Sequence, residues 1–342
     1  MSEVEFSDKD EGIELAKRMA EEEEGIGRRP KGPSRFVIPT IAVAWSLFQL
    51  STASWLILDS TYIRAIHLAF AMLIVYLNYP LFKKARFGLT YWSQTDRIPI
   101  PDYVLAVVAA FSALYIVIDY EGLSMRYGTP ILRDLVIGAA LVLLLLEAAR
   151  RVIGPALTVI ASVFIAYAFA GPYMPEVIEF KGVSLNRLLG QLTMSTEGIY
   201  GIPLDVSATV VFLFVLFGAM LNKAGAGQYF IQLALSLLGR FKGGPAKAAV
   251  LGSGMTGLVN GSSIANIVTT GTFTIPLMKK VGYTPTKAAA IEVAASTDGQ
   301  LAPPIMGAAA FIIAEYVNVP YVEVIKAAAV PAFASYAALL FI

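Results

Sequence analysis

The chain has 342 residues, of which 57% are hydrophobic and 15% are charged. Soluble domains are about 45–50% apolar and about 25% charged, so this composition argues against a soluble protein and predicts a polytopic membrane protein. The formal net charge of +1 gives no basis for nucleic-acid binding. The lack of cysteine and the single histidine exclude disulfides, thiolate metal sites and most histidine-based catalysis.

The first 35 residues are rich in charge. Residues 21–24 are all glutamate, and four basic residues follow before residue 36. Blocks of like charge are usually solvated and disordered. Residues 1–35 are therefore predicted to form a charged cytoplasmic tail.

Apolar segments of near-membrane length follow the tail. Each approaches the roughly 20 residues that cross a hydrocarbon core of about 30 Å, and a chain in lipid satisfies its backbone hydrogen bonds by forming helices. An all-α fold is therefore predicted. The segments are 36–58, 65–82, 103–118, 131–146 and 152–175.

The basic residues give these segments an orientation. They cluster before the first segment, after the second and after the fourth, whereas the alternate loops carry few. Because cytoplasmic loops are enriched in Lys and Arg, the N-terminus is predicted to be cytoplasmic and residues 172–204 extracytoplasmic. Residues 206–222 then return to the inner side, where Lys223 is expected. Residues 228–238 are too short to cross and are predicted to lie in the inner interface.

Residues 248–278 carry no charge, yet they are rich in Ser, Thr, Asn and Gly. A single helix of this length would measure about 46 Å, which exceeds the hydrocarbon core. The sequence Asn260–Ser263 favours a turn, and lysines flank both ends of the segment. A re-entrant helical hairpin is therefore predicted over residues 248–278, with its polar tip near mid-membrane, where transporters hold ions and substrates.

The next apolar segment, residues 288–314, is interrupted in its middle. Prolines 303 and 304 follow a polar stretch and remove backbone donors, so a broken helix with free carbonyl groups near residues 296–301 is predicted. An intramembrane carboxylate is a functional candidate by default, which singles out Asp298. Glu292 is predicted to have a structural role, pairing or capping near Lys287.

Several stretches resemble one family of membrane proteins. The resemblance is carried by residues 196–204 (TEGIYGIPL), 261–266 (GSSIAN), 269–283 (TTGTFTIPLMKKVGY), 294–300 (AASTDGQ) and 303–311 (PPIMGAAAF). They are similar to the DctM-like large subunit of the tripartite ATP-independent periplasmic (TRAP) transporters, in the form of a fused permease of the TAXI type. The resemblance covers roughly residues 36–342.

The resemblance implies a small-subunit-like transmembrane scaffold over residues 36–180, an extracytoplasmic connector over 181–204, and the first repeat of the permease domain over 205–342. The family's large subunit is an inverted repeat. The chain therefore resembles a permease truncated after its first repeat, whose remainder would be a missing C-terminal half or a second-repeat polypeptide.

The resemblance also implies a function, which is elevator-type import of organic anions, possibly C4-dicarboxylates, driven by a sodium or proton gradient. It implies no enzymatic activity and no cofactor beyond the coupling ion. The expected partners are an extracytoplasmic solute-binding protein and membrane lipid, in a multi-pass cell-membrane location.

The family's ion site maps onto the hairpin tip and the helix break. The predicted ion-binding residues are Ser262, Ser263, Asn266, Ser296, Thr297, Asp298 and Gly299, and the predicted substrate-binding residues are Asn260, Gly261, Thr269, Thr270 and Gln300. Asp298 departs from the family, which usually has glycine there, and an extra carboxylate could strengthen a cation site, carry a proton or repel an anion.

Two other functions remain open at the level of sequence. One is a broken-helix, ion-coupled carrier that works without a binding protein, and the other is a non-transporting scaffold fragment. An intramembrane protease is disfavoured, because no second carboxylate or lysine is convincingly placed to act with Asp298.

Overall fold

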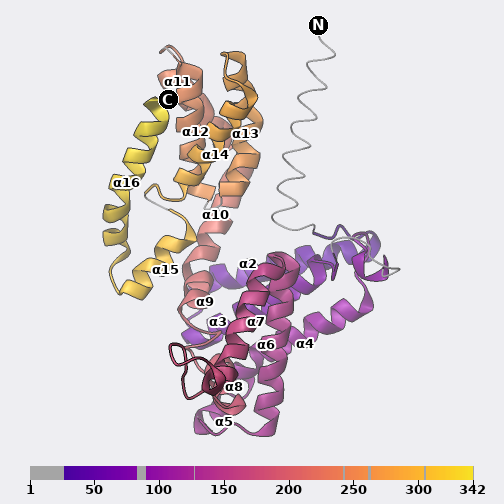
Figure 1. Ribbon diagram of the computed structural model, residues 1–342. Helices are drawn as coiled ribbons and strands as arrows, with labels where there is room; N and C mark the ends of the chain where they lie inside the picture. Colours follow the sequence, from indigo (N-terminus) through magenta and orange to yellow (C-terminus); the bar gives the residue numbers. More distant parts are fainter. Residues whose placement is uncertain are drawn as a thin grey trace. The chain divides into compact units, whose positions relative to one another are not determined.

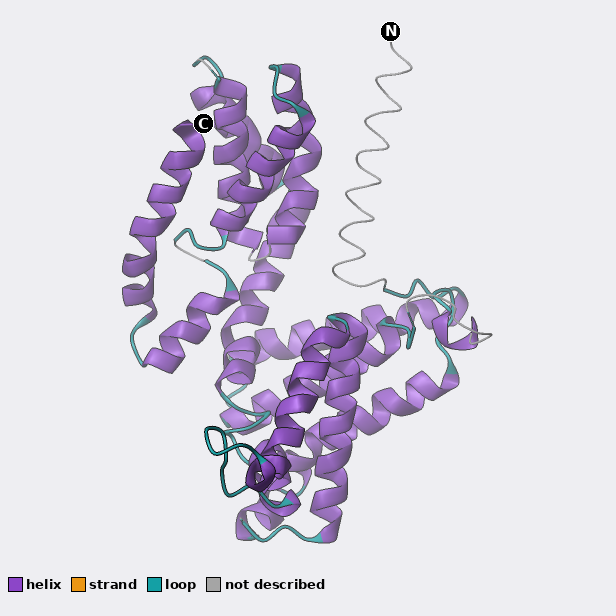
Figure 2. Ribbon diagram, viewed as in Figure 1, coloured by secondary structure: helices purple, strands orange, loops and turns teal. Residues whose placement is uncertain are grey.

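The computed structural model describes residues 27–82, 90–126, 128–241, 243–260, 263–303 and 306–341. All regular structure in these residues is helical, as Figures 1 and 2 show. Within them, five helical segments are long and apolar enough to cross a membrane, namely Ser60–Asn78, Ile100–Ile118, Pro155–Tyr173, Ile202–Leu221 and Tyr321–Phe341. The predicted all-α polytopic membrane protein is confirmed. Most of the predicted tail, residues 1–26, lies outside the described residues.

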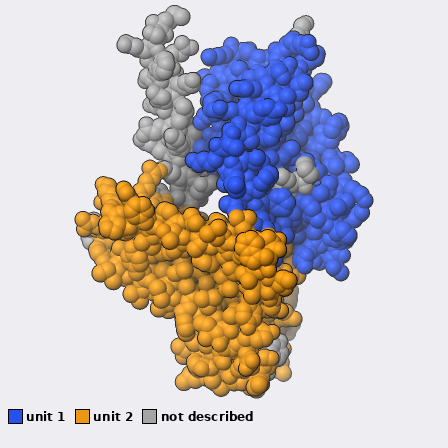
Figure 3. All heavy atoms as spheres, turned by 180° about the vertical axis from the view of Figure 1, so that it is seen from behind, with its two compact units in different colours: residues 1–20, 209–342 blue, residues 21–208 orange. Residues whose placement is uncertain are grey.

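The chain forms two compact units that divide between Ala208 and Thr209 (Figure 3). We call the described residues up to 208 the N-terminal unit and those from 209 onward the C-terminal unit. The longer helices of the N-terminal unit are α2 (Val37–Thr52), α3 (Ser60–Asn78), α4 (Ile100–Ile118), α6 (Leu132–Val152) and α7 (Pro155–Ala170). Shorter ones are α5 (Tyr120–Met125), α8 (Leu185–Thr193) and α9 (Ile202–Val206), with 3-10 turns at Gly32–Phe36, Thr90–Ser93 and Gly171–Tyr173 and a π-helical turn at Ser207–Val211.

Small side chains hold the core of the N-terminal unit together. Ala65 on α3 and Ala109 and Ala113 on α4 are fully buried, and small residues let helix backbones approach closely in a membrane protein. The large side chains in this core satisfy their polar ends. The hydroxyl of buried Tyr76 donates to the carbonyl of Leu144 at 2.8 Å. The packing of α3 on α4 therefore needs no charged contact along its length.

Charged side chains are buried elsewhere in the N-terminal unit. Asp102, in the first turn of α4, accepts from Arg28 Nη2 at 2.5 Å and from Arg151 Nη1 at 2.9 Å, and all three side chains are fully buried. Arg28 also donates to the carbonyls of Tyr76 and Leu77 at 3.2 and 3.3 Å. Asp102 thus joins the segment before α2 to α4 and α6.

The C-terminal unit consists of seven described helices. They are α10 (Phe212–Lys223), α11 (Ala226–Leu238), α12 (Gly244–Asn260), α13 (Ser263–Lys280), α14 (Pro285–Gly299), α15 (Ala308–Val317) and α16 (Tyr321–Phe341). From α11 to α14, each helix packs against the next one in the chain. Helix α16 lies against α12, α14 and α15. Proline begins α14 after Thr284, whose hydroxyl accepts from the backbone N–H of Lys287 as an N-cap.

Helix α11 covers the segment that is predicted to lie in the inner interface. It lies lengthwise against α12, because glycines remove the side chains that would hold the two helices apart. A Cβ on Gly252 would lie 3.1 Å from the Cα of Ile231, a distance that only a bare backbone permits. The chain leaves α10 and enters α11 through Gly225, whose φ of +88° is left-handed and favours glycine. Helices α10 and α11 are therefore two parts of a broken helical path.

Candidate functional site

Helices α12 and α13 form an antiparallel pair that packs on α14. At the base of the pair, Ala246 and Val250 of α12 meet Met278 of α13 and Ala288 and Ile291 of α14 in an apolar cluster. Helix α12 ends at Asn260 and α13 begins at Ser263, and residues 261 and 262 lie outside the described residues. The structure therefore contains two arms where the sequence predicts the arms of a hairpin.

A polar cluster lies between the arms and α14, closer to the tip than the apolar base. Its centre is Glu292, whose side chain is only 1% exposed. One carboxylate oxygen, Oε1, accepts from Ser253 at 2.8 Å and from Thr270 at 2.5 Å, and Ser296 donates to it at 3.1 Å. The other oxygen, Oε2, accepts from Thr274 at 2.6 Å. Four hydroxyl groups from three helices thus surround one carboxylate, and we call these five residues the Glu292 cluster.

Asn266 continues the cluster toward the tip. Its side-chain Nδ2 donates to the hydroxyl of Ser253 at 3.2 Å, to the hydroxyl of Ser296 at 3.0 Å and to the backbone carbonyl of Ser253 at 2.9 Å. An amide nitrogen only donates, and an ionised carboxylate only accepts. The two serine hydroxyls therefore accept hydrogen bonds from Asn266 and donate hydrogen bonds to Glu292. These hydrogen bonds thus run from Asn266 through the serines to the carboxylate.

The electrostatics of the cluster are unusual for a buried acid. Among the described residues, no lysine or arginine forms an ion pair with Glu292. Burying a charge costs several kcal/mol unless it is paired or fully hydrogen bonded. Hydroxyl donors alone compensate this carboxylate, which makes the cluster a place that attracts positive charge.

Helices α12 and α14 touch backbone to backbone on the tip side of the cluster. A Cβ added to Gly299 would lie 2.8 Å from the Cα of Gly257, and one added to Gly257 would lie 3.0 Å from the Cα of Gly299. A side chain at either position would push the two helices apart. This close contact explains why glycine stands at 299, one of the predicted ion-site positions, through packing between the helices.

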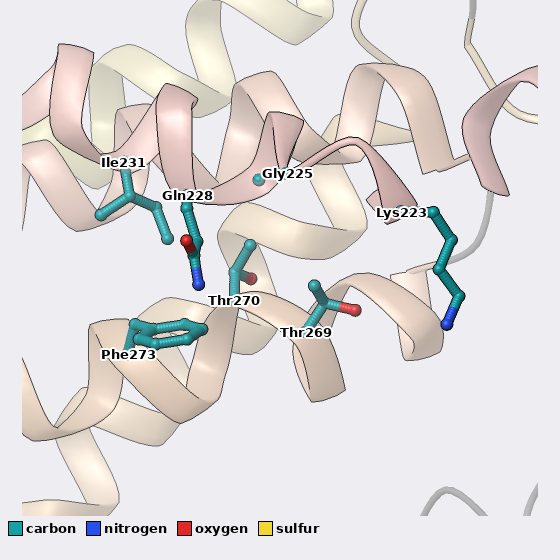
Figure 4. Close-up of a pocket in the computed structure, with 8 residues that line it drawn as sticks. Lys223, Gly225, Gln228, Ile231, Thr269, Thr270 and Phe273 are labelled. Atoms are coloured by element: carbon teal, nitrogen blue, oxygen red, sulfur yellow. The ribbon is translucent and has the colours of Figure 1, made fainter. Parts of the chain in front are cut away.

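A cavity of about 350 Å³ opens beside the cluster, between α11 and α13 (Figure 4). Ile231 and Phe273 stand at one end of it and Lys223 at the other, with Thr269 and Thr270 between them. Thr270 belongs both to the cavity wall and to the Glu292 cluster, because its hydroxyl donates to Glu292. The cavity and the buried carboxylate are thus separated by one side chain.

The structure brings together some of the predicted site residues. Asn266, Ser296 and Thr270 meet at the Glu292 cluster, and Thr269 lines the cavity. Ser263 begins α13. Gly261, Ser262 and the side chain of Asn260 lie outside the described residues.

Other predicted site residues point elsewhere. The hydroxyl of Thr297 donates back to the carbonyl of Val293 at 2.8 Å, on an exposed face of α14. Asp298 accepts from Ser335 of α16, away from Glu292. The backbone of Gln300 caps α14 and its carbonyl accepts from Gly307 at 2.7 Å.

The prediction of free carbonyls at the helix break is wrong in part. Helix α14 continues to Gly299, and the carbonyls of Thr297 and Asp298 accept from the backbone N–H groups of Gln300 and Leu301 at 3.1 and 3.0 Å. The reason is that the chain turns after Gly299 through local backbone hydrogen bonds before the prolines remove their donors.

Glu292, Ser253 and Thr274 are the site residues that sequence reasoning missed. Glu292 does not pair with Lys287, whose ammonium group lies over the ring of Tyr283 at 5.5 Å. A signal was present, because residues four apart share a helix face. Asn266, Thr270 and Thr274 are spaced by four, as are Glu292 and Ser296, so two polar stripes face each other within apolar helices.

The fold is that of a helical, polytopic membrane protein with a buried polar centre, and the similarity of the sequence shows its family. Residues 140–342 match the model of the tripartite ATP-independent periplasmic transporter, DctM component. The match covers more than half of the chain, and the chain belongs to this family.

Individual relatives are only 26–35% identical to the chain over the aligned residues. The chain is 35% identical over 91 residues to the C4-dicarboxylate TRAP transporter large permease protein DctM of Vibrio cholerae, which covers 27% of this chain and 20% of that protein. It is 27% identical over 180 residues to the isethionate TRAP transporter permease protein DctMQ of Oleidesulfovibrio alaskensis, covering 45% and 28% of the two chains. It is 26% identical over 119 residues to the ectoine TRAP transporter large permease protein TeaC of Halomonas elongata, covering 35% and 28%.

The aligned parts span only 20–28% of the length of these curated relatives. No solved structure shows a significant match to the chain.

Proposed function

We propose that the chain is the permease component of a secondary transporter that imports small organic anions. The driving force is the gradient of a monovalent cation, sodium or the proton, and an extracytoplasmic solute-binding protein delivers the substrate. The names of the relatives support the substrate class, since one is a C4-dicarboxylate permease and another an isethionate permease. The TAXI type and an elevator-type movement are part of the same proposal.

The observation that carries the proposal is the Glu292 cluster. A buried carboxylate with no basic partner among the described residues, held between two helical arms and a third helix, favours the binding of positive charge. The oxygen-bearing side chains of Asn266 and Ser296 extend the cluster toward the tip, where the coupling ion is expected. We propose that the arms of α12 and α13 enter and leave the membrane on the same side, with their lysine-bearing base at the cytoplasmic surface.

Transport by the purified chain tests this function. The chain is reconstituted into liposomes with any subunit that co-purifies with it, and uptake of radiolabelled succinate and isethionate is measured under a sodium gradient, a proton gradient or neither. A solute-binding protein from the same organism is added or left out. Uptake of one probe that needs one of the gradients and the binding protein supports the proposal.

Variants link the transport to the site. Asn266→Ala removes the amide that orients two serine hydroxyls, so we expect uptake to fall by about tenfold or more. Lys326→Gln is the matched control, because Lys326 is exposed and pairs only with Glu323 on its own helix. Uptake that depends on neither gradient, or that is undiminished without a binding protein, would contradict the proposal.

A further inference from the structure

The cavity between α11 and α13 has the size and chemistry of a small-molecule site. Its volume of about 350 Å³ lies within the range of roughly 300–1,000 Å³ that is usual for such sites. Apolar side chains of Ile231 and Phe273 line one end, and the polar groups of Lys223, Gln228 and Thr269 line the rest. The lining carries one charged residue, and its charge is positive.

The position of Lys223 along the hairpin is the second observation. Gly227 on α11 faces Thr256 and Thr269, with their methyl groups 3.8 and 3.9 Å from where its Cβ would lie. Thr256 is twelve residues beyond the start of α12 at Gly244, which places it roughly 18 Å from the hairpin base. Lys223 precedes Gly227 by one helical turn, on the tip side. Lys223 therefore lies far from the hairpin base, which we propose to be at the cytoplasmic surface.

An ammonium group at that depth needs a negative partner. Charged side chains within the membrane are costly and mark functional sites by default. Among the described residues, no carboxylate forms an ion pair with Lys223. Helix α10 ends at Lys223, and the left-handed Gly225 two residues later is the N-cap of α11, so Lys223 lies at one end of the cavity (Figure 4).

We propose that this cavity binds the anionic group of a small organic anion, with Lys223 as its ion-pair partner and Gln228 as a hydrogen-bond donor. The short carbon skeleton lies against Phe273 and Ile231. Thr270 joins this subsite to the Glu292 cluster, so substrate and coupling ion act on opposite sides of one threonine. The inference deepens the proposed function and rests on it.

Three lysine variants test the subsite in the full chain, with succinate and isethionate as probes. Lys223→Gln removes the charge and keeps most of the length. A charge-assisted hydrogen bond contributes roughly 1.5–3 kcal/mol, so we expect the KM for the transported probe to rise by about tenfold or more. Lys223→Arg keeps the charge and restores part of the affinity. Lys279→Gln, which removes a lysine at the hairpin base, leaves the KM unchanged.

Binding without transport separates the two proposals. Saturating probe raises the thermal unfolding midpoint of a protein that binds it, so the shift is measured for each purified variant in detergent. The expected result is a shift in the wild type and in Lys279→Gln that is lost in Lys223→Gln. If Lys223→Gln does not fold, the shifts in the thermal unfolding midpoint of Lys223→Arg and Gln228→Leu are compared instead.

The outcomes are distinct. Gradient-driven uptake with an unchanged KM in Lys223→Gln would overturn the subsite and leave the transport function standing. Probe binding that depends on Lys223, with uptake that ignores every gradient, would overturn the function and keep the subsite. A wild type that neither binds nor transports either probe would overturn both.

Discussion

The two units each bury a carboxylate, and they neutralise it in opposite ways. Asp102 in the N-terminal unit lies between two buried guanidinium groups, Arg28 and Arg151. Glu292 in the C-terminal unit lies among four hydroxyl groups and has no basic partner among the described residues. A guanidinium only donates hydrogen bonds, whereas a hydroxyl both donates and accepts. The donors around Asp102 therefore cannot become acceptors, whereas the hydroxyl groups around Glu292 can.

The largest expected effect comes from Asp102→Asn. The variant removes the negative charge that two buried arginines share, and breaking a buried ion pair costs about 3–5 kcal/mol. We expect a loss of that size in the free energy of unfolding, measured by SDS titration in mixed micelles. Glu323→Gln, at an exposed pair with Lys326, is the control and changes the free energy by less than about 1 kcal/mol. Equal effects of the two variants would refute the assignment.

Glu292→Gln is expected to cost less, although the chemical change is the same. The hydroxyls of Ser253 and Thr270 can rotate to accept from the new amide, which leaves a loss of about 2–3 kcal/mol for imperfectly satisfied groups. The same titration measures it. A destabilisation larger than that of Asp102→Asn would break the comparison, because it would show that the hydroxyl groups tolerate a neutral side chain no better than the two arginines do.

Gly257→Ala tests whether close packing holds the Glu292 cluster closed. The added Cβ would lie 3.0 Å from the Cα of Gly299 and would push α12 away from α14, at a cost of about 1–2 kcal/mol. Gly190→Ala in α8 is the matched control, because nothing lies within 4 Å of its Cβ. Alanine there should stabilise the helix by up to about 1 kcal/mol. Thermal midpoints of both variants measure the contrast, and a stabilised Gly257→Ala would contradict the packing.

The smallest effect concerns a half-buried charge of the N-terminal unit. Asp119 ends α4 and accepts from Arg126 at 2.7 Å, and this hydrogen bond lowers the pKa of Asp119 below its ordinary value of 3.8. A lowered pKa adds stability that is fully present above the ordinary value and is lost as the pH falls through the lowered one. Asp119→Asn should therefore be slightly less stable than the wild type near neutral pH, with the difference vanishing in strong acid. Thermal midpoints across pH measure it, and a constant difference would argue against the pair.

Sequence patterns predicted the helices well, because lipid permits few alternatives. The uncharged segments became helices, and the turn chemistry of Asn260–Ser263 coincides with the boundary between α12 and α13. The bounds were less accurate. Residues 36–58 form a helix only as far as Thr52, since apolar composition alone does not fix where a helix ends.

The content of the site was harder to predict, because it depends on how three helices face one another. Asn266 and Ser296 were identified from a family motif, yet the carboxylate that they surround was assigned to a structural role. Sequence gives the spacing within each stripe, but not that Ser253 of α12 meets both stripes. Asp298 attracted attention as a departure from the family, and the structure turns it toward α16.

Helix α16 is tied to α14 by side chains, and this has a mechanical meaning. Tyr336 donates to the carbonyl of Ala295 at 2.9 Å, and its ring fills the space that a side chain at Gly254 would occupy. Ser335 bonds to Asp298 one turn further along α14. A displacement of α14 therefore moves α16 as well, and α15, which lies between them in the chain, has to adjust its position. Motion of the Glu292 cluster would therefore be transmitted to α16.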